Sequence, residues 1–133
     1  MEELLSSDPP GQWVEKVRAL AYSNRFVRLW RDPPLMVYLG DHGDYLLVDG
    51  HYCSCPGFTM RTSRRGVAGC THVYAVRIAL REGRFRDLSG SLGPGDVAAI
   101  VWEVLTGGLA VIVRRMLALE DHVGDDHYGG EDG

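Results

Sequence analysis

Three cysteines and one histidine form two short pairs in this chain. Cys53 and Cys55 make a C-x-C pair, and Cys70 and His72 make a C-x-H pair, with fourteen residues between the pairs. The 133-residue chain contains no other cysteine. Three thiolates and one imidazole suit tetrahedral zinc, and four protein ligands close the shell of a structural site. The two pairs therefore predict one structural zinc ion.

The spacing of each pair restricts the backbone that can carry it. Two residues on one strand face point outward in parallel, so Cys55 must fold back after Cys53, and Pro56-Gly57 offers the turn. On a helix, residues two apart lie roughly 200° apart around the axis. We therefore expect Cys70 just before a helix and His72 in its first turn, where the positive helix N-terminus favours an anionic thiolate cluster.

Two other interpretations of these residues remain open. The cysteines can be buried thiols without a metal, beside a surface histidine. Alternatively, Cys53 and Cys55 can form a redox dithiol, which leaves Cys70 and His72 without a role. His51 is the nearest rival ligand, and we expect it beside the site or in solvent. The other histidines have no competing spacing: His42, His122 and His127.

The elements that must position these ligands follow from apolar periodicity and turn residues. The predicted fold is α+β, with a small antiparallel β-sheet, a ββα zinc module, an N-terminal helix and C-terminal apolar helices. The GDHGD sequence indicates a hairpin between the second and third strands. The expected elements are a helix at 11–22, strands at 25–30, 35–39 and 45–50, a loop at 56–69, a helix ending at Gly83 and, at 97–120, two packed helices or one weakened helix.

The length of the chain suits one domain with one modest core. Along it we expect four segments. They are an N-terminal helix and first strand at 1–34, the zinc module at 35–88, a C-terminal helical segment at 89–120 and a disordered acidic tail at 121–133.

The stretches YLLVDGHYCSCPGF and CTHVYAVRIAL place C-x-C-x14-C-x-H between a hairpin and a helix. Over roughly residues 35–83 this resembles the SWIM zinc finger family. The resemblance implies a ββα zinc module whose ligands are Cys53, Cys55, Cys70 and His72. SWIM domains bind DNA or proteins in transposases, ubiquitin ligases, chromatin proteins and recombination factors.

Here the module is nearly the whole chain, which resembles the small recombination-accessory SWIM proteins of Shu-type complexes. Those proteins pair with RecA-family recombinase paralogues. The resemblance implies an accessory or adaptor protein in DNA recombination or repair. The alternative is a nucleic-acid-binding zinc finger regulator that acts alone.

Positive charge is concentrated around the Cys/His pairs. Residues 51–90 hold seven arginines and two acidic residues, although the whole chain has a net charge of −4. This acidic balance argues against a dedicated strong DNA binder. The arginines of this block nevertheless form a candidate nucleic-acid surface, and the alternative is a solvated or protein-facing surface. The candidate residues are Arg61, Arg64 and Arg65 in the loop, and Arg77, Arg81 and Arg84, which recur at helical spacing beside Tyr74 and Ile78.

Residues 97–119 are apolar at nearly every position and lack the polar stripe of a half-exposed helix. The segment can form this protein's own core, or it can meet a partner chain or a second copy. We expect Trp102, Val111 and Ile112 at such an interface. Glu103 and the Gly107-Gly108 pair argue against a membrane span.

No catalytic motif is evident, since the sequence has no P-loop, no G-x-G-x-x-G and no Ser/His/Asp arrangement of note. We therefore expect a binding protein rather than an enzyme. The acidic start, MEELLSSDPP, has no apolar run and predicts no signal peptide. Three cysteines cannot form a complete disulfide framework, so we expect an intracellular protein of the cytoplasm or nucleoid.

Overall fold

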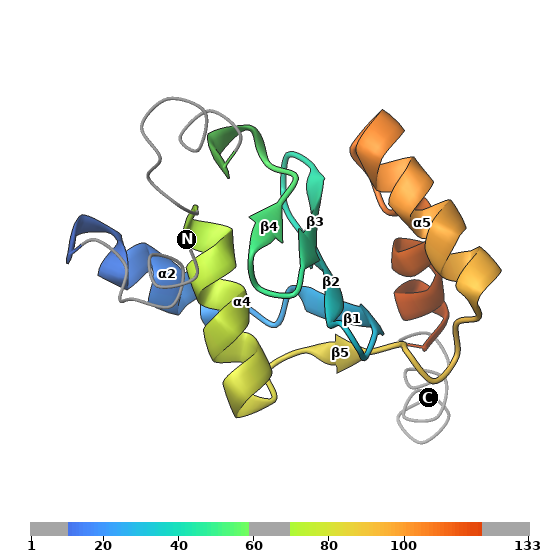
Figure 1. Ribbon diagram of the computed structural model, residues 1–133, viewed down its shortest axis with the longest axis horizontal. Coiled ribbons are helices and arrows are strands. Elements are labelled where there is room, and N and C mark those ends of the chain that lie inside the picture. Colours follow the sequence, from blue (N-terminus) through green and yellow to red (C-terminus); the bar gives the residue numbers. More distant parts are fainter. Residues whose placement is uncertain (1–10, 59–69, 121–133) are drawn as a thin grey trace, which may run out of the picture.

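A five-stranded sheet forms the centre of the fold, as the computed structural model shows for residues 11–58 and 70–120 (Figure 1). The strand order is β4-β3-β2-β1-β5. Residues 1–10, the expected acidic tail at 121–133 and most of the expected loop at 56–69 lie outside the described residues. The strands are β1 (Phe26–Trp30), β2 (Leu35–Leu39), β3 (Asp44–Val48), β4 (Tyr52–Cys53) and β5 (Arg86–Asp87).

The predicted α+β class is confirmed, but the sheet is mixed rather than wholly antiparallel. Strands β1 to β4 pair as antiparallel neighbours, whereas β5 pairs in parallel with β1. The parallel pair arises because the chain crosses from β4 to β5 through a helix and returns in the direction of β1. Strands β4 and β5 have two residues each, too few to show a periodic pattern.

The helices begin and end close to the predicted boundaries. A 3₁₀ turn, η1 (Gly11–Trp13), leads into α2 (Val14–Ala21), and α4 (Thr71–Glu82) ends at Gly83, whose φ of 69° is left-handed. The C-terminal segment is two helices, because Gly108 ends α5 (Pro94–Gly107) with a φ of 75°. The second helix, Val111–Glu120, is bent by 119° from α5.

Helices cover both faces of the sheet (Figure 1). Helices α2 and α4 lie on one face, and α5 and the Val111–Glu120 helix lie on the other. Side chains alternate accordingly: Met36 and Leu47 join the core beneath α4, whereas Val37 and Leu46 join the core beneath α5. Because both faces are buried, the strands are apolar along nearly their whole length.

Two hairpins carry the chain to the first cysteine pair. In the first, β2 and β3 pair in register from Leu35 with Val48 to Leu39 with Asp44, which confirms the predicted hairpin. In the second, Leu47 lies opposite Cys53, and Asp49 and Gly50 turn the chain with positive φ angles. The edge strand β4 thereby brings Cys53 to the side of the sheet that α4 covers.

No single helix in the described ranges is long and apolar enough to cross a bilayer, although α5 and Val111–Glu120 together reach that length and composition across their bend.

Candidate metal centre

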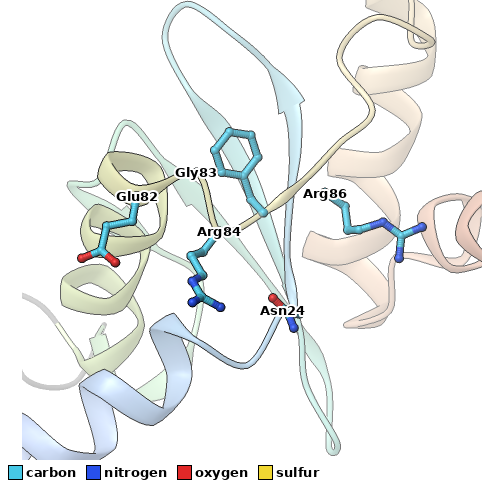
Figure 2. Close-up of a pocket in the computed structure, with 6 residues that line it drawn as sticks. Asn24, Glu82, Gly83, Arg84 and Arg86 are labelled. Carbon is cyan, nitrogen blue, oxygen red and sulfur yellow. The ribbon is translucent and has the colours of Figure 1, made fainter.

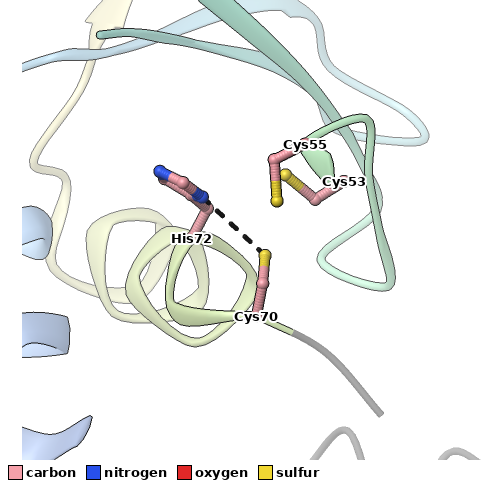
Figure 3. A group of neighbouring side chains, drawn as sticks. All are labelled: Cys53, Cys55, Cys70 and His72. Atoms are coloured by element: carbon pink, nitrogen blue, oxygen red, sulfur yellow. Dashed lines mark hydrogen bonds between the residues drawn. The ribbon is translucent and has the colours of Figure 1, made fainter. Parts of the chain in front are cut away.

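Cys53, Cys55, Cys70 and His72 converge on one point (Figure 3). Their candidate ligand atoms all lie within 4.8 Å of one another. The Sγ of Cys70 is 3.8 Å from Nδ1 of His72. In a tetrahedral zinc site, with Zn–S bonds of about 2.3 Å, neighbouring donor atoms lie roughly 3.5–3.8 Å apart. The four side chains are therefore close to the geometry that one tetrahedral ion requires, and they form a candidate metal site.

Local backbone structure brings Cys55 back toward Cys53. Ser54, between them, fixes the turn to β3: the Leu46 N–H donates to its Oγ at 2.9 Å, and its own N–H donates to the Leu46 carbonyl at 2.9 Å. Residues 56–58 are helical, and the Phe58 N–H donates to the Sγ of Cys55 at 3.3 Å. The predicted fold-back after Cys53 is confirmed.

The second ligand pair occupies the start of α4, as the spacing predicted. Cys70 is the N-cap residue, with extended φ and ψ of −143° and 176°. Its carbonyl accepts the N–H of Val73 at 3.2 Å, so the helix begins directly behind the thiol. His72 lies in the first turn. The partial positive charge of the helix N-terminus faces the thiol cluster, where it stabilises thiolates.

Burial and mutual contact make the three thiols unequal. All three cysteines are buried and none is in a disulfide. Hydrogen bonds with Cys55 and Cys70, together with burial, raise the pKa of Cys53, whereas hydrogen bonds from the other two thiols lower the pKa of Cys55. A hydrogen bond with Cys53 lowers the pKa of Cys70, but contact with Cys55 and burial outweigh it and raise the pKa to about 12.

The pKa values of the three thiols shift in opposite directions because three buried sulfurs lie close together with little positive charge nearby. One thiolate is stabilised by two neighbouring thiols, and a second or third negative charge is disfavoured. A divalent cation at the centre removes this conflict, because thiolates are the metal-binding form of cysteine. The chemistry of the donor set therefore fits a soft divalent metal such as zinc.

Two tyrosines that the sequence did not single out support His72. Tyr38 and Tyr45 lie opposite each other in the β2–β3 hairpin. Their ring centroids are 4.8 Å and 5.2 Å from that of His72. Burial raises the pKa of Tyr38. The cross-strand pair fixes the imidazole between the sheet and α4, and one tyrosine in each strand of the predicted hairpin was the only sequence signal for it.

The rival ligands do not join this group within the part of the chain that the structure describes. His51 lies on the β3–β4 turn, with Nδ1 3.7 Å from an Asp49 carboxylate oxygen. His42 lies between β2 and β3. His122 and His127 fall outside the described residues.

The arginines predicted to contact nucleic acid do not form a single stripe. Arg61, Arg64 and Arg65 lie outside the described residues. Arg81 is 71% exposed at its side chain, but Arg77 is half-buried, and its Nε donates to the Gly50 carbonyl at 2.9 Å. Arg84 follows the left-handed Gly83 and leaves α4, so the i, i+4, i+7 spacing breaks there. Tyr74 is buried, and its ring centroid lies 6.0 Å from the guanidinium carbon of Arg77.

The C-terminal segment has more apolar side chains than the core buries, and several of them are exposed to solvent. Trp102 is 70% and Val111 46% exposed, while Ile112 is partly buried against the core beneath α5. We call the exposed set the C-terminal apolar face; its large members are Trp102, Leu105, Leu109, Val111 and Leu119.

Comparison of this chain with protein-family models, with curated proteins and with solved structures finds no match.

Proposed function

We propose that this chain is a zinc-binding module of SWIM type that acts as an adaptor in DNA recombination or repair. The observation that carries the proposal is the convergence of Cys53, Cys55, Cys70 and His72, whose spacing along the chain resembles that family. Four protein ligands leave no coordination position for a substrate. The metal therefore has a structural role, and the chain acts by binding rather than by catalysis.

The adaptor role is supported by the C-terminal apolar face. Monomeric proteins rarely leave large contiguous apolar patches uncovered, and exposed tryptophan is a frequent anchor of protein interfaces. Trp102 is 70% exposed and Leu105, one helical turn further, is 54% exposed. We propose that a protein partner covers this face. The resemblance favours a recombinase paralogue of the RecA family, and a second copy of this chain is the alternative partner.

A nucleic-acid-binding regulator that acts alone is the competing function. It draws support from the exposed Arg81, but Arg77 is held by the Gly50 carbonyl and is poorly placed to reach a phosphate. We therefore rank the adaptor first and DNA contact as an additional property of the same protein.

Affinity capture of the tagged chain from its native cell, followed by mass spectrometry, tests the adaptor role. We expect a recombinase paralogue in stoichiometric amount with the wild type and its loss with Trp102→Ser. A Val14→Ser variant is the matched control, because Val14 is an exposed apolar residue on the opposite side of the sheet. Recovery of nucleic acid without any stoichiometric protein would favour the lone regulator.

A further inference from the structure

A hydrogen bond between Arg77 and Gly50 joins the two elements that carry the candidate metal ligands. Nε of Arg77, on α4, donates to the Gly50 carbonyl at 2.9 Å, across 27 residues of sequence. Gly50 lies in the turn between β3 and β4, just before the first ligand pair at Cys53 and Cys55. Arg77 lies on the same helix as the second pair, about two helical turns after Cys70. The bond therefore connects the two halves of the site.

The backbone at Gly50 allows Arg77 to approach closely. Asp49 and Gly50 have φ angles of 54° and 68°, and both positive values are typical of a two-residue hairpin turn. A Cβ at Gly50 would lie 3.3 Å from Cγ of Arg77, so a side chain there would crowd the arginine stem. Gly50 is buried, and water would be a poor replacement for Arg77 at its carbonyl.

Arg77 differs from the two arginines that follow it at helical spacing. Arg81, one turn further along α4, is 71% exposed at its side chain. Arg84 lies beyond the end of the helix, where its guanidinium carbon is 4.6 Å from the Tyr22 ring centroid (Figure 2). One terminal nitrogen of Arg77 is buried with no hydrogen-bond partner among the described residues. This burial has a free-energy cost, which the bond to Gly50 and the packing of the arginine stem must offset.

Two separated attachments fix the angle between the β3–β4 turn and α4. The first is the group of four candidate ligands at the N-terminus of the helix (Figure 3). The second is the Arg77–Gly50 hydrogen bond, about 10 Å further along the helix axis. One attachment leaves the hairpin free to rotate about it, whereas two do not. Apolar packing between the sheet and α4 supports both. The second attachment therefore keeps the two ligand pairs side by side.

We propose that Arg77 is a positioning residue for the metal centre. It holds the β3–β4 turn against α4, so that less of the site has to be ordered when the metal binds. Such preorganisation raises affinity by reducing the cost of binding. The inference rests on the metal centre that carries the proposed function, and it gives a role to a residue outside the ligand set.

The test is the rate of zinc release from the whole zinc-loaded chain to an excess of a chromophoric chelator, together with the zinc affinity from chelator competition. Arg77→Met keeps an apolar stem and removes the donors, so it should speed release and weaken affinity by about tenfold. Arg77→Lys retains one charged donor and should recover part of this loss. Arg81→Met is the matched control on the exposed side of the same helix, and it should change both quantities by less than about twofold.

A second variant separates positioning from a general loss of stability. Arg114→Met breaks the contact with Asp44 on the opposite face of the sheet. It should speed zinc release by less than about threefold, because it does not loosen the elements that carry the ligands. Equal acceleration by Arg77→Met and Arg114→Met would overturn the proposal, as would wild-type release and affinity in Arg77→Met. A wild-type chain that binds no zinc would overturn the metal centre and this inference together.

Discussion

The buried carboxylate of Asp44 accepts two hydrogen bonds from the guanidinium of Arg114. Nε of Arg114 lies 2.8 Å from Oδ2, and its second nitrogen lies 2.5 Å from Oδ1. The backbone N–H groups of Ala110 and Gly40 donate to the same carboxylate at 2.8 Å and 3.2 Å. Asp44 is 1% exposed, so these four donors take the place of water around its carboxylate. This pair attaches the Val111–Glu120 helix to the start of β3, on the face of the sheet opposite the metal centre.

Replacing Arg114 with Met should destabilise the protein by about 3 kcal/mol, because a buried carboxylate then loses its charged partner. Arg115→Met is the matched control, since the neighbouring Arg115 is exposed and its loss should change the free energy of unfolding by less than about 0.5 kcal/mol. Urea unfolding of both variants measures the difference. Equal midpoints for the two variants would show that the Asp44–Arg114 pair does not hold the helix.

The same pair makes stability depend on pH. Burial raises the pKa of Asp44, but the hydrogen bonds from Arg114, Ala110 and Gly40 outweigh burial and hold the pKa below its ordinary value. A depressed folded-state pKa contributes stability that is complete above the unfolded pKa, about 4, and is lost as the pH falls through the folded value.

The stability difference between wild type and Asp44→Asn should therefore be largest near neutral pH and shrink below about pH 4. Metal release at acid pH affects both proteins alike and largely cancels in this difference. Urea unfolding at pH 7, 5 and 3 measures it. A difference that stays constant over this range would contradict the role assigned to the Asp44 charge.

Arg77 should behave as a structural residue. Burial lowers its pKa, its Nε donates to the Gly50 carbonyl, and one of its terminal nitrogens is buried with no hydrogen-bond partner among the described residues. Arg77→Glu should destabilise the protein by about 3 kcal/mol, because it buries an anion against a carbonyl oxygen. Arg81→Glu, on the exposed side of α4, should leave the melting temperature nearly unchanged. A folded Arg77→Glu variant with wild-type stability would show that Arg77 is free to face solvent or a ligand.

Trp102→Ser should dissociate any assembly that forms through the C-terminal apolar face while leaving the fold intact. The side chain is 70% exposed, so its removal opens no cavity in the core. Sedimentation velocity of the purified protein and of its complex measures the assembly, and Val14→Ser is the control. A wild-type chain that is monomeric at high concentration and captures no partner from cells would contradict the interface.

The sequence was most informative where a pattern is local. Spacing alone identified the four candidate ligands, the first β-hairpin and the end of α4 at Gly83, because each depends on nearby residues. It was least informative where a residue's role depends on distant partners. Asp44 looked like an ordinary turn residue, because an acid after His42-Gly43 in a hairpin connection is usually solvated. Its burial depends on Arg114, seventy residues away along the chain.

The break in the arginine stripe has a similar origin. Periodicity placed Arg84 on the same helical face as Arg77 and Arg81, but Gly83 adopts a left-handed conformation and directs Arg84 toward Tyr22. The parallel strand β5 was also beyond the reach of a pattern, because its two residues pair with β1 only after α4 has crossed the sheet. These features are set by tertiary packing rather than by local propensity.

Removal of one ligand should unfold the region around the metal. Cys70→Ser should lose the metal and much of the stability of the chain, because a structural zinc ion contributes on the order of 10 kcal/mol of apparent binding energy to the folded state. Ser54→Ala, between two ligands but with its side chain accepting the Leu46 N–H, should keep the metal and lose about 1 kcal/mol. Elemental analysis and thermal unfolding of the two variants distinguish these outcomes.

X-ray absorption at the zinc edge, together with the zinc content of protein purified without chelators, tests the account most directly. We expect one zinc per chain, with three sulfur neighbours at about 2.3 Å and one nitrogen neighbour at about 2.0–2.1 Å. Cys53, Cys55 and Cys70 supply the sulfurs and His72 the nitrogen. Protein that is fully folded with no bound metal, or zinc surrounded mainly by oxygen, would contradict it.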